Sequence, residues 1–144
     1  MKVYSRDKRS PVPKNEAISR MMSANKAKET LPEITFRKKL WKLGYRGYRK
    51  NYIKLPGKPD IVFPSKRVTI FVNGCYWHRC PTCRLPLPKT NIVFWKKKFK
   101  RNKERDQENL VKLKSLGWKT LVVWECSIKD NLAKELKGVK ILLS

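Results

Sequence analysis

The four cysteines of this chain are spaced like a set of metal ligands. Cys75, Cys80 and Cys83 fall within one short segment, and Cys126 follows an apolar run that predicts a buried strand. A sheet can carry this fourth thiol back to the other three. Thiolates suit tetrahedral zinc, and a closed shell of four sulfurs leaves no position for a substrate, so a structural zinc site is predicted. The alternatives are two disulfides, an iron cluster and unlinked buried thiols.

An acid and a base stand beside predicted strands. Asp60 begins the apolar segment 60–63, and His78, the only histidine, follows the apolar segment 68–72. Hydrolysis of a phosphodiester needs a cation to neutralise the phosphate and a base to take a proton from the attacking water. Asp60 suits Mg²⁺ and His78 suits the base. Alternatively, Asp60 is an exposed aspartate at the start of a strand, and His78 is a spare zinc ligand or a surface residue.

A predicted antiparallel hairpin brings this acid and this base together. Segments 60–63 and 68–72 are both apolar, and the four residues between them form a tight polar turn. With this turn, Asp60 faces Phe71, and the start of the first strand lies beside the end of the second. His78 is therefore expected near Asp60.

The remaining elements are predicted from hydrophobic periodicity and from helix start and stop residues. The run at 118–124 is apolar enough for a central strand covered on both faces. The expected class is α/β (α+β), a single domain with a mixed central sheet flanked by helices. We expect helices over residues 30–43, 91–116 and 128–137, and further strands over 45–53, 118–124 and 139–143.

The chain is strongly basic. It contains 36 Lys and Arg against 11 Asp and Glu, a formal net charge of +25. An excess this large repels itself and is normally tolerated only with a polyanionic partner, so nucleic acid is the first candidate. The alternatives are a ribosome-type binding protein, a surface adapted to unusual salt or temperature, and a membrane-surface binder. The apolar runs are short and no export signal is recognisable, so we expect a cytoplasmic protein.

The organisation along the chain follows from composition. Residues 1–28 are polar and basic and predict an N-terminal arm with one short helix, whereas residues 29–144 predict the folded domain. We expect a monomer.

Several short motifs follow one another in a known order. They are 56–60 (PGKPD), 71–78 (FVNGCYWH), 94–95 (FW), 102–106 (NKERD), 116–118 (LGW) and 123–126 (VWEC). This series resembles the very-short-patch mismatch repair (Vsr) family of DNA endonucleases over residues 22–126. The resemblance implies a restriction-endonuclease-like core that nicks one strand of duplex DNA 5′ of the T in a T:G mismatch, which arises by deamination of 5-methylcytosine.

The resemblance also implies roles for individual residues. Asp60 is the Mg²⁺-binding acid, the backbone carbonyl of Val72 is a second ligand, and His78 acts on the attacking water. Glu33 and Asp106 match acidic positions that support the water shell of the metal. The implied zinc ligands are Cys75, Cys80, Cys83 and Cys126, and the aromatic residues inserted beside the mismatch are Tyr76, Trp77 and Trp95. Flat rings can stack on bases wedged apart, and ordinary core packing is the alternative for these rings.

Some positions depart from the family pattern. Better-known members have Thr then His where this chain has Val72 then Asn73. A carbonyl ligand tolerates the first change, whereas the second removes a base or a phosphate contact. Cys80 stands where some members use His as a zinc ligand. The second acid and the Lys usual in restriction-enzyme cores are also absent, since the corresponding positions 71–73 hold FVN.

Two other functions compete with mismatch nicking. One is a related nicking or restriction endonuclease with another target, and the other is a zinc-stabilised DNA-binding module without catalysis. Asp60 and His78 favour an enzyme, because a pure binding module has little use for either residue at this spacing. The expected partner is double-stranded DNA with a T:G mismatch, with mismatch-repair proteins as further partners.

Overall fold

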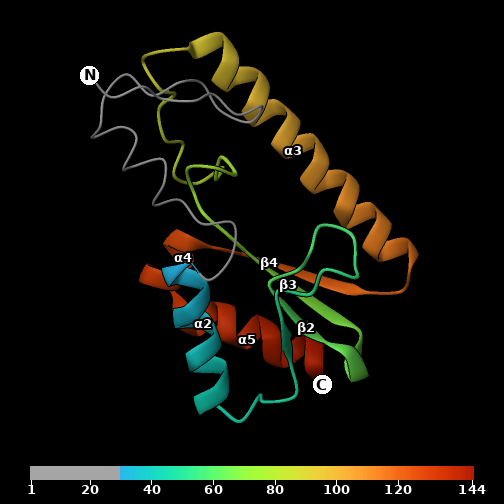
Figure 1. The fold of residues 1–144 in the computed structure, drawn as a ribbon. Helices are drawn as coiled ribbons and strands as arrows, with labels where there is room; N and C mark the ends of the chain where they lie inside the picture. The colour runs from blue at the N-terminus through green and yellow to red at the C-terminus, as the bar shows by residue number, and fades with distance from the viewer. Residues whose placement is uncertain (1–29) are drawn as a thin grey trace, which may run out of the picture.

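The computed structural model describes residues 30–144, so the predicted arm at 1–28 lies outside the described residues. This part of the chain forms one α+β domain with a four-stranded mixed sheet, which confirms the predicted class (Figure 1). In chain order the elements are α2 (Leu31–Lys42), β1 (Arg49–Lys50), β2 (Ile61–Phe63), the short 3₁₀ helix η1 (Pro64–Lys66), β3 (Val68–Asn73), α3 (Ile92–Ser115), β4 (Lys119–Trp124), α4 (Glu125–Asp130) and α5 (Leu132–Leu143).

The sheet has the strand order β1-β2-β3-β4. Strand β2 is antiparallel to both β1 and β3, and β4 is parallel to β3. Ile61 pairs with Ile70, a register that sets Asp60 opposite Phe71 and confirms the predicted hairpin. The central position predicted for 118–124 is wrong, because β4 forms an edge of the sheet in residues 30–144. Helices α3, α4 and α5 contact β4 and bury its apolar residues without a second neighbouring strand.

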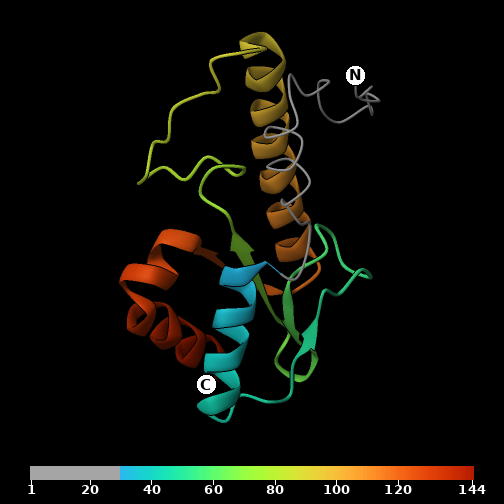
Figure 2. The same cartoon turned by 60° about the vertical axis from the view of Figure 1, so that its left-hand side comes forward.

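Helices form a layer on each face of the sheet. Helix α3 covers one face, and α2, α4 and α5 lie on the other, as Figures 1 and 2 both show. Side chains alternate along a strand, so Ile70 of β3 enters the main core, whereas Phe71 and Asn73 point to the α3 side. The main core combines Phe36 and Leu40 of α2 with strand and C-terminal helix residues: Ile61, Phe63, Val68, Ile70, Val123, Ile128, Leu136 and Val139.

Helix α2 begins and ends close to the predicted residues. The Thr30 hydroxyl accepts a hydrogen bond from the backbone N–H of Glu33 at 3.4 Å, and Pro32 fits the first turn. Gly44 follows with φ +93°, a conformation that glycine adopts without strain. This capping fixes where Glu33 stands at the start of the helix.

Two predicted strands are wrong in whole or in large part. The strand predicted over 45–53 is reduced to Arg49–Lys50, because Asn51 takes a left-handed φ of 50° that ends the extended conformation. The strand predicted over 139–143 is the second half of α5. Leu136 and Val139 are buried at helical spacing and pack into the core, so tertiary burial selects the helix for a run whose composition suits either structure.

Helix α3 is the longest element of residues 30–144 and confirms the helix predicted over 91–116. Its N-terminal half extends away from the sheet in both ribbon views (Figures 1 and 2). No helix in this part of the chain combines the length and the apolar character needed to span a membrane.

Candidate active site and metal centre

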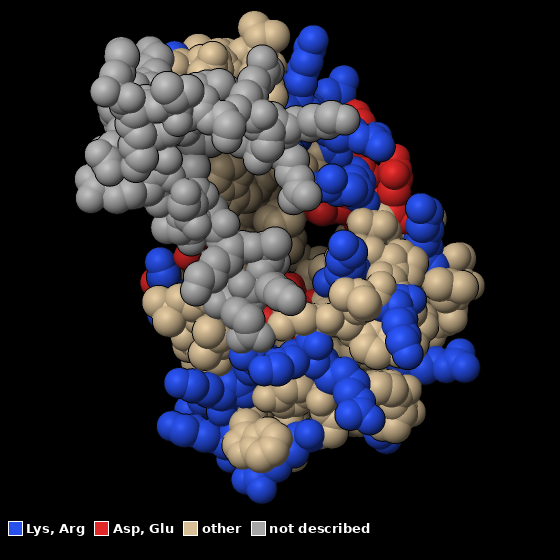
Figure 3. Space-filling view, viewed as in Figure 1, with Lys and Arg blue, Asp and Glu red and all other residues tan. Residues whose placement is uncertain are grey.

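A cleft of about 530 Å³ is formed by α3, by the α3 side of β3 and β4, and by the adjoining loops. Acidic atoms show in the hollow beneath α3 in Figure 3. Four residues predicted for the site line this cleft together, namely Asp60, Val72, His78 and Asp106. Asn73 lines it too, at the position where better-known family members have His. The structure therefore brings together residues that lie up to 46 positions apart in the sequence.

Asp60 lies directly before β2 and points at the end of β3. Its Oδ2 accepts a hydrogen bond from the backbone N–H of Val72 at 2.7 Å. Burial raises the pKa of Asp60 from its usual 3.8 to about 7, the hydrogen bond from Val72 opposes this rise, and the charge of Glu33 adds to it. A divalent cation at this carboxylate would offset the cost of its burial as an anion, so the chemistry of the site suits a hard metal ion.

Glu33 supplies a second carboxylate close to Asp60. Its side chain is only 2% exposed, and its Oε1 accepts a hydrogen bond from Nη1 of Arg37, one helical turn further along α2, at 2.9 Å. This ion pair compensates for the burial of the charge. Glu33 does not line the cleft, and it acts on Asp60 through its charge.

His78 and Asp106 form a hydrogen-bonded pair across the cleft. His78 lies in the loop after β3, and its Nδ1 is 2.7 Å from Oδ2 of Asp106 on α3. About a third of each side chain is exposed. With the proton on Nδ1 donated to the carboxylate, Nε2 of a neutral ring is left to accept a proton. The sequence did not predict this pair, because one sequence does not show which face of α3 turns towards the loop.

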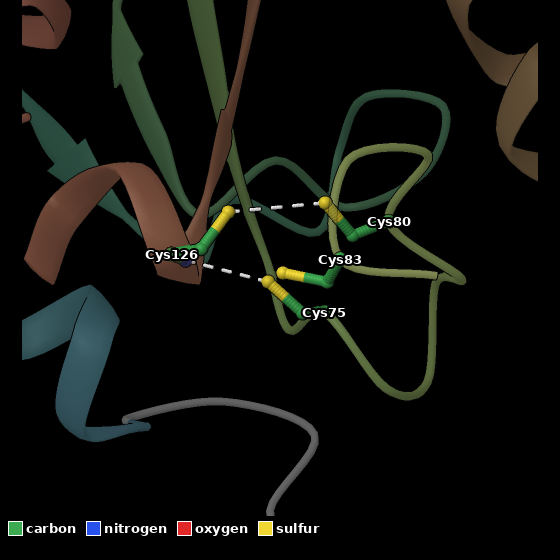
Figure 4. Close-up of side chains that lie close together, drawn as sticks. All are labelled: Cys75, Cys80, Cys83 and Cys126. Carbon is green, nitrogen blue, oxygen red and sulfur yellow. Dashed lines mark hydrogen bonds between the residues drawn. The ribbon is translucent and has the colours of Figure 1, made fainter. Parts of the chain in front are cut away.

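The four cysteines converge as predicted. Cys75, Cys80 and Cys83 belong to the cysteine loop (residues 74–91), and Cys126 stands in the first turn of α4 (Figure 4). All four are free thiols, and their sulfur atoms lie within 4.8 Å of one another. The Sγ atoms of Cys80 and Cys126 are 3.8 Å apart. A tetrahedral zinc with Zn–S bonds of about 2.3 Å holds its sulfurs about 3.8 Å apart, so the cluster has the size of a zinc site.

The polypeptide around the cluster is arranged to hold the sulfurs. The backbone N–H of Cys126 donates to Sγ of Cys75 at 3.3 Å, and the N–H of Cys80 donates to the carbonyl of Cys75 at 2.9 Å. Burial raises the pKa of the Cys75 thiol above its usual value, so a cation is needed to hold this sulfur as a thiolate at neutral pH. The cluster thus ties the cysteine loop to the junction of β4 and α4.

The three predicted DNA-contacting rings belong to one aromatic cluster between the cysteine loop and α3. The ring centroids of Tyr76 and Trp77 are 5.1 Å apart, and those of Trp77 and Trp95 are 5.6 Å apart. Trp95 also stacks on Phe99 at 5.7 Å. Tyr76 and Trp77 are partly exposed, whereas Trp95 is only 8% exposed. Packing against α3 therefore fixes the rings beside the cleft.

Arg79 is a residue of the site that was not predicted from the sequence. Its guanidinium lies 4.6 Å from the ring centroid of Phe99 and 5.4 Å from that of Tyr76. It also donates hydrogen bonds to the carbonyls of Tyr76 and Leu85. The sequence feature that could have pointed to Arg79 is its position directly after His78, in a segment rich in aromatic residues. Arg79 joins the aromatic cluster to the backbone of the cysteine loop.

Comparison with known proteins identifies a family and several relatives of the chain. The model of the family described as DNA mismatch endonuclease Vsr matches residues 2–84 of the chain. The chain is 44% identical to the type II nicking enzyme V.NaeI of Lentzea aerocolonigenes over 80% of its own length and 71% of the relative. It is 42% identical to the type II nicking enzyme V.XorIIP of Xanthomonas oryzae pv. oryzae over 85% and 89% of the two chains.

A third relative is the DNA mismatch endonuclease Vsr of Escherichia coli, which is 38% identical over 58% of this chain and 54% of the relative. Together these matches define a DNA endonuclease, a hydrolase of phosphodiester bonds. The chain belongs to the DNA mismatch endonuclease Vsr family, as the sequence motifs predicted.

Proposed function

We propose that this protein nicks one strand of duplex DNA 5′ of the T in a T:G mismatch left by deamination of 5-methylcytosine, with Mg²⁺ as its catalytic metal. The observation that carries the proposal is the pairing of His78 with Asp106 in the same cleft as Asp60. A base oriented by a carboxylate, next to a buried acid that favours a cation, is the arrangement that phosphodiester hydrolysis requires. The name of the Escherichia coli relative supports a mismatch as the target.

The metal-binding part of the proposal rests on Asp60. Its carboxylate, fixed by the N–H of Val72, would hold Mg²⁺ together with the backbone carbonyl of Val72. When bound, Mg²⁺ neutralises charge on the phosphate that is attacked. Asp106 lines the same cleft and would support the water shell of the metal, and Glu33 would support it from behind Asp60 through its charge. Both ligands of this chain offer oxygen, the donor that Mg²⁺ prefers.

His78 takes the proton of the attacking water in this proposal. The ring accepts the proton at Nε2, while Nδ1 stays bonded to Asp106. The carboxylate of Asp106 both orients the ring and stabilises the cation that forms when the ring is protonated. Asp106 would therefore contribute to catalysis through His78 in addition to its part in the water shell.

The four cysteines would bind a structural zinc ion. Zinc bound by four thiolates has no open position, so its contribution is to fold the cysteine loop onto the start of α4. That loop carries His78 as well as Tyr76 and Trp77. The zinc site would thus hold the base and two rings of the aromatic cluster in place without taking part in the reaction.

The aromatic cluster would provide the preference for a mismatch. A mismatched step is easier to unstack than a matched one, so rings inserted beside it convert this difference into selective binding. We propose that the partly exposed Tyr76 and Trp77 insert there, with the buried Trp95 packed behind Trp77 as part of the same DNA-contacting cluster. The basic charges of the chain would add affinity for any DNA, because phosphate contacts carry no sequence information.

A second candidate is favoured by the names of two relatives. V.NaeI and V.XorIIP are described as type II nicking enzymes, so this chain would be a related nicking endonuclease with another target. The test compares the nicking rates of two duplexes that differ only in T:G or C:G at one site, with Mg²⁺ and zinc-loaded protein. Mismatch nicking predicts cleavage of the T:G duplex alone. Equal rates would favour the second candidate, and cleavage of neither duplex would favour a DNA-binding module.

A further inference from the structure

A second groove, of about 500 Å³, lies between α2 and β1 and shares no lining residue with the active-site cleft. It is lined by Ile34, Arg37, Lys38, Trp41, Lys42, Tyr48 and Lys50, and none of these residues is acidic. Figure 3 shows Lys and Arg side chains gathered over α2 in the lower part of the molecule. The groove is thus a separate basic surface.

The centre of this groove is an exposed aromatic ring that is held in place. Half of Trp41 is exposed, an unusual position for the largest apolar side chain. The ring of Tyr48 meets it edge-on with 6.5 Å between centroids, and the guanidinium of Arg46 lies 5.0 Å from its ring centroid. Nε of Arg46 also donates to the carbonyl of Trp41 at 3.2 Å. These contacts fix the ring while leaving much of it open to solvent.

The stability of α2 explains only part of the charge around the ring, because Lys42 stands in the last turn, where the helix dipole favours a cation. Lys38 and Lys42 are exposed and stand one helical turn apart, a spacing at which like charges destabilise a helix. Arg37 differs from them, because it is ion-paired to the buried Glu33 at 2.9 Å. A polyanion bound along the groove would relieve the repulsion between the two lysines.

We propose that the groove between α2 and β1 binds single-stranded DNA, with a base stacked on Trp41 and phosphates at Lys38 and Lys42. A basic groove with a fixed aromatic ring suits single strands, because every unpaired base offers a flat face, whereas the bases of an intact duplex are paired and stacked on one another. A strand end that separates from its complement next to a nick is the single strand that the proposed function would supply. In this respect alone the inference rests on the proposed function.

The test measures binding of a labelled oligothymidylate of about twelve nucleotides by fluorescence anisotropy, with zinc-loaded full-length protein and no Mg²⁺. An abasic oligomer of the same length serves as the probe without bases. Trp41→Ala should weaken binding of the oligothymidylate roughly tenfold or more and leave binding of the abasic oligomer unchanged. Because nicking plays no part in this assay, its outcome is independent of the proposed function.

A charge-reversal pair tests the phosphate contacts. Lys38→Glu with Lys42→Glu should weaken binding of both oligomers and reduce the salt dependence of log K by roughly 0.7 for each phosphate that the protein no longer binds. The matched control is Lys134→Glu with Lys137→Glu on α5, which makes the same change in net charge at two other exposed positions. The control should bind the oligothymidylate clearly more tightly than the groove variant.

Four results would overturn the inference. The first is an equal loss of affinity in the control pair, which would mean that only net charge matters. The second is loss of oligothymidylate binding in Trp77→Ala but not in Trp41→Ala, which would place single strands on the aromatic cluster. The third is an equal loss of affinity for matched duplex DNA in Trp41→Ala. The fourth is unchanged binding of the oligothymidylate in both groove variants.

Discussion

The carboxylate of Asp60 gives the sharpest test of the active-site electrostatics. Asp60→Asn removes the charge but keeps the size of the side chain and an oxygen that accepts the hydrogen bond from Val72. The buried carboxylate of wild type is disfavoured as an anion, which is why its pKa is raised to about 7. The variant should therefore be more stable than wild type at pH 8 when no Mg²⁺ is present, although it should no longer nick DNA.

The size of this effect follows from linkage between protonation and folding. The folded chain holds the proton of Asp60 more tightly than the unfolded chain, so the stability that this group contributes is complete below pH 3.8 and is lost as the pH rises through about 7. One pKa unit corresponds to about 1.4 kcal/mol, so the loss approaches about 4 kcal/mol. Roughly 2 to 3 kcal/mol of it falls between pH 5 and pH 8.

The assay is urea unfolding at pH 5 and pH 8, followed by circular dichroism, with one equivalent of zinc and no Mg²⁺. The free energy of unfolding of Asp60→Asn minus that of wild type should be roughly 2 to 3 kcal/mol larger at pH 8 than at pH 5. Asp130→Asn, an exposed change at the end of α4, should show no such growth. Added Mg²⁺ should stabilise wild type at pH 8 and not Asp60→Asn. An equal difference at both pH values would refute this explanation of the raised pKa of Asp60.

Three further predictions concern the base, the zinc site and the aromatic cluster. His78→Ala should lower the single-turnover nicking rate about 10²- to 10⁴-fold while zinc content and melting temperature stay as in wild type; zinc loss in this variant would show that the ligand set is wrong. Cys126→Ser should lose zinc, as measured by metal analysis, and its free energy of unfolding should fall by several kcal/mol. The exposed control Ser115→Ala should change neither quantity. A Cys126→Ser protein that keeps one zinc and full stability would contradict the four-thiolate site. Trp77→Ala should reduce the affinity for T:G duplex by about 1 to 3 kcal/mol and that for matched duplex much less, at fixed salt. Equal losses on the two duplexes would assign this ring to packing alone.

The hairpin and the cysteine cluster could be predicted because short-range patterns determine them. A four-residue turn between two apolar runs leaves one register that buries both, and this register sets Asp60 opposite Phe71. The cysteine cluster followed from ligand chemistry, since the three thiols of the cysteine loop need one more ligand and Cys126 follows a strand parallel to β3. The hairpin has one register that buries both apolar runs, and the cysteine loop has one further cysteine that can complete its set of ligands.

Features that depend on long-range packing could not be predicted in this way. The pairing of His78 with Asp106 depends on how α3 is rotated against the cysteine loop, and periodicity does not fix that rotation. The segment 139–143 is apolar enough for a strand or a helix, and the burial of Val139 in the core decides for the helix. The groove at Trp41 was missed for a similar reason, because Tyr48 approaches the helix only after the chain has turned at Gly44.

The most direct test of the proposed function is to map the nick on a duplex that carries a single T:G mismatch, with each strand labelled in a separate reaction containing Mg²⁺ and zinc-loaded protein. Mismatch nicking predicts one product, cut 5′ of the mismatched T in the T-containing strand only, and no product from Asp60→Asn. Cleavage of the G-containing strand, cuts at sites unrelated to the mismatch, or the same product from Asp60→Asn would contradict it.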